Sequence, residues 1–189
     1  MADYFSPTVI QQAIPETDMT PLERLILTAI FDADATEEGL YFYSQQGPSD
    51  VVELPRAELQ AALAASRTLQ SAANALVAEQ LAAIGGDKDS KDIELDLRAT
   101  SWEFLFQSIV RRSAALRYIT AITSYMCSKM LPDGFGGSAL FITSDAIRGY
   151  STHEFLADCL ADIAGGPSVG LGASRRPGSP DTSSDGNVH

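Results

Sequence analysis

The chain has 189 residues, 45% of them hydrophobic, and a formal net charge of −12 at pH 7. This composition indicates a globular protein with a substantial core, and no apolar run approaches the roughly 20 residues that cross a bilayer. The negative charge disfavours direct binding to nucleic acid or to anionic membranes, and it favours partner proteins with a basic surface.

The cysteines and the start of the chain indicate a reducing compartment. Cys127 and Cys159 are too few for a disulfide framework, and residues 1–5 lack the basic and apolar segments of a signal peptide. We therefore expect a cytoplasmic protein. No cofactor and no metal are expected. Two cysteines and one internal histidine, His153, cannot close a structural zinc site without carboxylates, none of them has metal-ligand spacing, and no calcium-loop pattern is present.

In chain order, the first half predicts an extended arm, a helix, a β-hairpin and two further helices. Residues 1–19 form the arm. Thr20-Pro21-Leu22-Glu23 has the form of a capping box and predicts the start of the first helix. Two strands paired as a hairpin and two helices are predicted to follow, at residues 40–44, 51–54, 56–65 and 69–84.

The second half predicts a strand, a helix, a hairpin and a last helix. Residues 93–97 alternate as in a half-exposed strand, and Thr100-Ser101-Trp102-Glu103 predicts a capped helix with Trp102 in its buried stripe. Residues 118–130 and 138–147 are predicted to pair across the glycine-rich turn 132–137. A third capping box, Ser151-Thr152-His153-Glu154, precedes a helix whose predicted buried residues are Phe155, Leu156, Cys159, Leu160 and Ile163.

These elements predict an α+β fold. Residues 1–163 are expected to form a single domain, in which five helices pack against an antiparallel sheet with a central hairpin. Residues 164–189 are rich in glycine, serine, proline and charge, and they are predicted to be a disordered tail.

The acidic residues concentrate in the first half of the chain. Residues 1–97 hold 17 acidic and 5 basic residues, whereas residues 98–189 hold 8 of each. The candidate partner-binding acids lie in two loops that border the predicted first hairpin: Asp32, Asp34, Glu37, Glu38 and Asp50. A cluster of this kind would speed the encounter with a basic partner, and a solvated surface is the alternative.

Aromatic and basic residues of the second half give further candidates. Phe135, in the glycine-rich turn, is the candidate aromatic contact with a partner, and Phe104 lies off the buried stripe of its helix. Arg111 and Arg112 lie at the predicted end of the same helix. They could belong to a nucleic-acid site, but their interaction with the helix dipole is favoured.

Cys127 is the candidate nucleophile of an alternative function, a thiol-dependent enzyme. Lys129 would share its strand face and activate the thiol, and His153 would be the general base. The competing interpretation is a buried strand cysteine and an exposed histidine at a helix start, and it is favoured because free cysteines are usually core residues.

Two segments, Thr100–Phe104 (TSWEF) and Cys127–Gly137 (CSKMLPDGFGG), resemble a family of uncharacterised proteins from plasmid-bearing proteobacteria. Thr20–Leu25 and Arg56–Leu59 fit the same pattern. No activity is established for this family, so the resemblance implies no catalytic residue and points only to a bacterial accessory gene. The function that we predict is binding to a macromolecule, and its sharper form is an acidic inhibitor that mimics nucleic acid on a basic partner protein.

Overall fold

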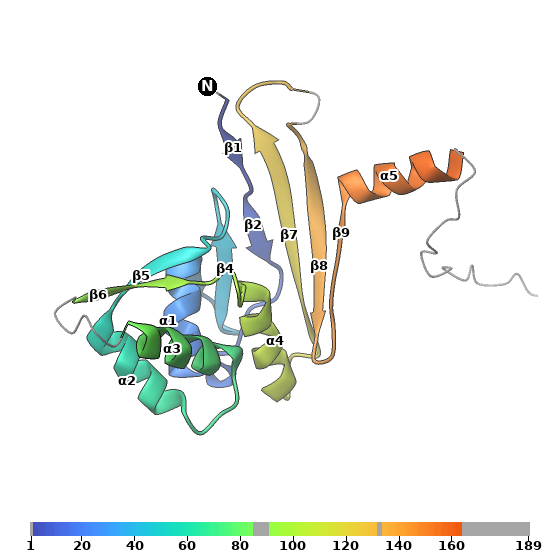
Figure 1. Ribbon diagram of the computed structural model, residues 1–189. Helices are drawn as coiled ribbons and strands as arrows, with labels where there is room; N and C mark the ends of the chain where they lie inside the picture. The colour runs from blue at the N-terminus through green and yellow to red at the C-terminus, as the bar shows by residue number, and fades with distance from the viewer. Residues whose placement is uncertain (1, 85–90, 132–133, 164–189) are drawn as a thin grey trace, which may run out of the picture. The chain divides into compact units, whose positions relative to one another are not determined.

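The computed structural model describes residues 2–84, 91–131 and 134–163, which form an α+β fold as predicted (Figure 1). The chain divides into two units, residues 1–154 and residues 155–189. The predicted disordered tail lies outside the described residues. None of the helices in the described part is long and apolar enough to cross a membrane.

The first unit is built on an antiparallel sheet with the strand order β3-β4-β2-β7-β8-β9, in which β1 also pairs with β7. A separate two-stranded sheet contains β5 and β6. The strand bounds are β1 Tyr4–Phe5, β2 Thr8–Ile10, β3 Asp32–Ala35, β4 Leu40–Ser44, β5 Val51–Pro55, β6 Asp92–Asp96, β7 Tyr118–Cys127, β8 Gly136–Thr143 and β9 Ile147–Ser151. The helices of the first unit are the 3-10 helix η1 Glu16–Asp18, α1 Pro21–Ile30, α2 Arg56–Ser66, α3 Ala72–Ala83 and α4 Trp102–Arg112.

The predicted arm is part of the main sheet. β2 lies between β4 and β7, with Thr8 opposite Ser44 on one side and opposite Thr123 on the other. β1 and β2 both pair with β7, and Pro7 lies between them. The Pro7 carbonyl accepts a hydrogen bond from the Ser124 N–H at 2.9 Å. Because proline has no N–H to donate to the hydrogen bonds between strands, this segment forms two short strands instead of one.

An aromatic cluster joins α4 to the sheet. Trp102 and Phe106 of α4 pack edge-on against each other, and each contacts Phe31 at ring-centroid distances of 5.4 and 6.0 Å. Phe42 of β4 completes the cluster. Trp102 is 8% exposed, so the prediction that it anchors the core is confirmed. Figure 1 shows α4 beside β7 and β8, with α1 and α3 next to it.

The predicted hairpin of residues 40–44 and 51–54 is wrong. Both strands form, but β4 is paired on its two sides with β3 and β2, whereas β5 pairs with β6. β3, expected as a loop, and β2, expected as part of the arm, take both edges of β4, so no edge remains for β5. The hairpin of β7 and β8 is confirmed, with Tyr118 opposite Thr143 and Tyr125 opposite Gly136.

Two of the three predicted capping boxes are present. In α1 the Thr20 hydroxyl accepts from the Glu23 N–H and the Glu23 carboxylate accepts from the Thr20 N–H. The same reciprocal pair joins Ser151 and Glu154. The third prediction is wrong, because α4 begins one residue later, with Ser101 at the N-cap and no side-chain hydrogen bond to the cap.

The helix α5, Thr152–Ile163, begins in the first unit and supplies the described part of the second. The helix is confirmed, but the burial of its apolar stripe is wrong. None of its residues is buried, and the exposed fractions of Phe155 and Leu156 are 52% and 57%. An apolar stripe specifies an amphipathic helix, whereas burial also needs a second surface.

Candidate functional site

The outer face of the main sheet carries no buried residue in its central row. The strand register places one residue of each strand in this row: Asp32, Tyr43, Val9, Ile122, Ala139 and Tyr150. All six are exposed or half-buried. The residues that alternate with them, such as Phe42, Ile10 and Ala121, point to the opposite face and are buried in the core. The sheet therefore has one face in the core and one open face.

At the β3–β4 end, the open face is acidic and aromatic. Asp32 lies opposite Tyr43, and Asp34 lies opposite Tyr41. The two tyrosine rings are stacked, with centroids 5.6 Å apart. The negative charge of Asp34 is the main cause that raises the pKa of Tyr43 above 10.0, and partial burial, Asp32 and a hydrogen bond to Asp34 add to the effect. The carboxylates and the phenol groups of this face therefore interact electrostatically and by a hydrogen bond.

The turn between β3 and β4 adds two more carboxylates, Glu37 and Glu38. Gly39 closes this turn with a φ of +142°, and a side chain there would overlap the carbonyl of Ile14, so only glycine fits. The backbones of Ile14 and Leu40 exchange two hydrogen bonds, of 2.8 and 2.9 Å, which tie the turn to the arm. We call Asp32, Asp34, Glu37, Glu38, Tyr41 and Tyr43 the acidic–tyrosine face.

Four predicted partner-binding acids therefore share one hairpin. Asp32, Asp34, Glu37 and Glu38 are all exposed, and none of them belongs to the three ion pairs found among the described residues. Within the part of the chain that the structure describes, no ion pair neutralises their charge. The aromatic part of the face was not predicted, because only the strand register shows that the tyrosines lie opposite the aspartates.

The two other predicted partner residues lie elsewhere. Asp50 precedes β5, and its carbonyl accepts from the Leu97 N–H at 2.8 Å, close to the positive charge of Arg98. Phe135 precedes β8 and is 41% exposed, beyond the paired end of β7 and β8. The structure does not bring Asp50 or Phe135 to the acidic–tyrosine face.

The residues of the thiol-enzyme alternative lie in different environments. Cys127 ends β7 and is 8% exposed, and the backbone of Gly134 packs so closely on it that a side chain at Gly134 would contact the Cys127 Cβ at 2.7 Å. Lys129 follows the end of the strand, so strand alternation does not place it on the face of Cys127. His153 is exposed in the first turn of α5.

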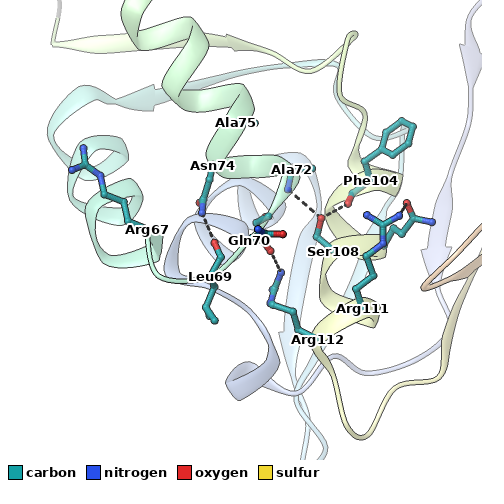
Figure 2. A pocket seen from close by; sticks show the side chains of 12 residues that line it. Arg67, Leu69, Gln70, Ala72, Asn74, Ala75, Phe104, Ser108, Arg111 and Arg112 are labelled. Atoms are coloured by element: carbon teal, nitrogen blue, oxygen red, sulfur yellow. Dashed lines mark hydrogen bonds between the residues drawn. The ribbon is translucent and has the colours of Figure 1, made fainter.

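A second candidate site, missed by the sequence analysis, is a groove between α3 and α4 with a volume of about 710 Å³ (Figure 2). Arg67, Leu69 and Asn74 line it from the α2–α3 side, and Phe104 and Arg111 line it from α4. Arg112 lies at its lower edge in Figure 2. We call it the arginine groove.

Beneath the groove, the buried carboxylate of Glu23 and its partner Arg112 connect η1, α1, the start of α3 and α4. Glu23 of α1 is fully buried and accepts hydrogen bonds from the Thr20 N–H at 2.8 Å and from the Ser71 hydroxyl at 2.6 Å. The Arg112 guanidinium of α4 forms an ion pair with it and also donates to the backbone carbonyls of Gln70 and Asp18. Arg112 is therefore a structural partner of Glu23, in addition to any interaction with the helix dipole.

Comparisons of the chain with models of protein families, with curated proteins and with solved structures found no match. The resemblance of Thr100–Phe104 and Cys127–Gly137 to a bacterial family therefore stays a prediction. Within the part of the chain that the structure describes, no three His, Cys, Asp or Glu side chains form a group that could hold a metal ion.

Proposed function

We propose that the protein binds a partner protein with a basic surface through the acidic–tyrosine face. The observation that supports this most directly is the pairing of Asp32 with Tyr43 and of Asp34 with Tyr41 on an exposed, hydrogen-bonded hairpin. Carboxylates form charge-assisted hydrogen bonds with lysine and arginine side chains, and phenol rings bind the same cations through their faces. The two groups therefore suit one class of partner.

The β3–β4 hairpin is held by backbone hydrogen bonds, which favours binding to a partner protein over a purely solvated surface. β3 and β4 pair over four residues, and the Gly39 turn is tied to Ile14 by backbone hydrogen bonds. A ligand-binding surface held by backbone pairing loses little conformational entropy on binding. Carboxylates on such a surface bind with less entropic cost than carboxylates on a flexible loop.

The specific form of the proposal is an inhibitor that occupies a nucleic-acid-binding surface. Proteins that bind nucleic acid present clustered lysine and arginine side chains to phosphates, and an exposed cluster of carboxylates competes for the same cations. A partner of this kind would be released from DNA or RNA when this protein binds. The association would weaken as the salt concentration rises, because the charges lie at the surface.

The experiment compares two variants with equal net charge. The test variant carries Asp32→Asn, Asp34→Asn, Glu37→Gln and Glu38→Gln. The control variant removes four exposed acids outside the face, at Glu53, Glu58, Glu79 and Glu94. Each protein is used to recover partners from the native host, and the recovered protein is then purified. Its affinity is measured at low and high salt and in competition with DNA.

We expect the control variant to retain the partner and the test variant to bind it at least about tenfold more weakly, a loss of about 1.4 kcal/mol. Equal affinities of the two variants would contradict the proposal and leave these acids as solvated surface. Binding that DNA does not compete with would contradict only its specific form, the nucleic-acid mimic.

A further inference from the structure

We propose that the arginine groove binds a small amphipathic anion, namely an organic acid with a carboxylate and an apolar body. The groove lies between α3 and α4, and its volume of about 710 Å³ is within the range of roughly 300–1,000 Å³ that is typical of small-molecule sites. This proposal is independent of the acidic–tyrosine face, which lies on other elements.

The charge of the groove contrasts with the charge of the chain. Three arginines line it, and no acidic residue of the described chain does, although the net charge of the protein is −12. The charge of Arg112 is balanced by the buried Glu23. The charges of Arg67 and Arg111 remain, because neither residue forms one of the ion pairs found among the described residues.

Arg111 is held in a fixed position without being neutralised. Its Nε donates to the Ser144 carbonyl at 2.6 Å, and its Nη2 donates to the Gln107 side-chain oxygen at 3.0 Å. Both acceptors are neutral. A guanidinium has five N–H donors, so the donors of Nη1 remain for a ligand. A preoriented cation of this kind binds a carboxylate with little loss of side-chain entropy.

The same groove exposes two large apolar side chains. Leu69 is 48% exposed and Phe104 is 46% exposed; Leu69 lies in the segment before α3 and Phe104 on α4, and their side chains point away from each other (Figure 2). An apolar body that covers either side chain would remove it from water, which is favourable in proportion to the area covered. Phe104 lies off the buried stripe of α4, and in this proposal its exposed ring contacts the apolar part of the ligand.

The neighbouring polar groups argue against a simple phosphate site. The first N–H groups of α3 are already bonded: Ala72 donates to the Ser108 hydroxyl at 3.1 Å, and Ala73 donates to the Ser71 hydroxyl at 3.2 Å. A helix start binds phosphate through free N–H groups, and these are occupied. Two arginines and two apolar side chains remain, and together they fit a carboxylate with an apolar chain.

The test uses the full-length protein and three probes with the same ten-carbon chain: decanoate, decanol and decyltrimethylammonium. Calorimetry measures their affinities, and inorganic phosphate serves as a probe without an apolar body. Amide chemical shifts in an NMR titration locate the site. We expect decanoate to bind most tightly, decanol more weakly and the cation least, with shift changes at Leu69, Ala72, Phe104 and Ser108.

Two variants test the residues. Arg67→Gln should weaken decanoate binding about threefold to fivefold, as expected for a partly exposed ion pair, without changing decanol binding. Phe104→Ser should weaken both probes to a similar extent. The matched controls are Arg148→Gln and Phe135→Ser, which change an exposed arginine and an exposed phenylalanine outside the groove and should leave both affinities unchanged.

Four outcomes would overturn the proposal. The first is equal affinity for the three ten-carbon probes, which would show that charge has no role. The second is shift changes confined to residues outside the groove, such as Met130 and Phe135. The third is equal loss of binding in the groove variants and in their controls. Binding of phosphate as tight as that of decanoate would also exclude the amphipathic ligand.

Discussion

Removal of Arg112 should be the most destabilising single change on the surface of α4. The Glu23 side chain has no exposed area and that of Arg112 is 18% exposed, so their charges interact largely away from water. In Arg112→Met, Glu23 keeps the neutral donors of Thr20 and Ser71 but loses the cation with which it forms an ion pair. Breaking a buried pair in this way costs about 3–5 kcal/mol.

For a chain of this length, 1 kcal/mol shifts the Tm by about 2–4 °C, so Arg112→Met should lower the Tm by about 6–20 °C. Glu23→Gln should cost less, because Arg112 keeps the Gln70 and Asp18 carbonyls as acceptors. The double variant should be more stable than the sum of the two losses predicts, since neither charge then lacks a partner.

Thermal and urea unfolding of the four proteins give this cycle directly. Arg98→Gln is the control, because the pair of Arg98 and Asp96 is exposed by 71% and 41% and should contribute little. If Arg112→Met lowered the Tm no more than Arg98→Gln does, the inference that the buried pair holds α1, α3 and α4 together would be refuted.

Three further predictions concern single residues. Trp102→Ala should cost about 3–5 kcal/mol in urea unfolding because it empties the aromatic cluster, whereas Phe104→Ala, on the exposed side of the same helix, should cost much less. Asp34→Asn should return the raised pKa of Tyr43 toward 10.0, which phenolate absorbance measures. In the native protein the raised pKa favours the neutral phenol. The stability that this shift contributes is therefore fully present below pH 10 and is lost as the pH rises through the raised pKa. Gly39→Ala should lower the Tm and weaken partner binding, since a side chain there overlaps the Ile14 carbonyl; an unchanged Tm would contradict the assigned turn.

Local patterns predicted the helices well, and strand pairing poorly. Thr20 and Glu23 specify the start of α1 through bonds within four residues, so the sequence alone is sufficient. β3 has the sequence Asp-Ala-Asp-Ala, whose residue types are depleted in strands, and it is extended because β4 pairs with it. The pairing of β5 with β6 joins segments far apart in the chain, whereas adjacent strands suggested a local hairpin.

The candidate sites were predictable only in part, for the same reason. The four acids of the acidic–tyrosine face are close in sequence and could be identified as a cluster. Their alignment with Tyr41 and Tyr43 depends on register, which composition does not determine. The arginine groove needs Arg67 at the end of α2 and Arg111 on α4 to line the same cavity, and no local sequence pattern predicts this.

The place of β2 has a consequence for the synthesis of the protein. Thr8 leaves the ribosome before its partner Thr123, which lies 115 residues later in the chain. The main sheet cannot be completed until β7 has been made, so the edge of β2 that pairs with β7 must wait without its final neighbour. Contacts of such long range slow folding and leave unpaired strands open to aggregation. Newly made chains should therefore depend on chaperones until β7 is complete.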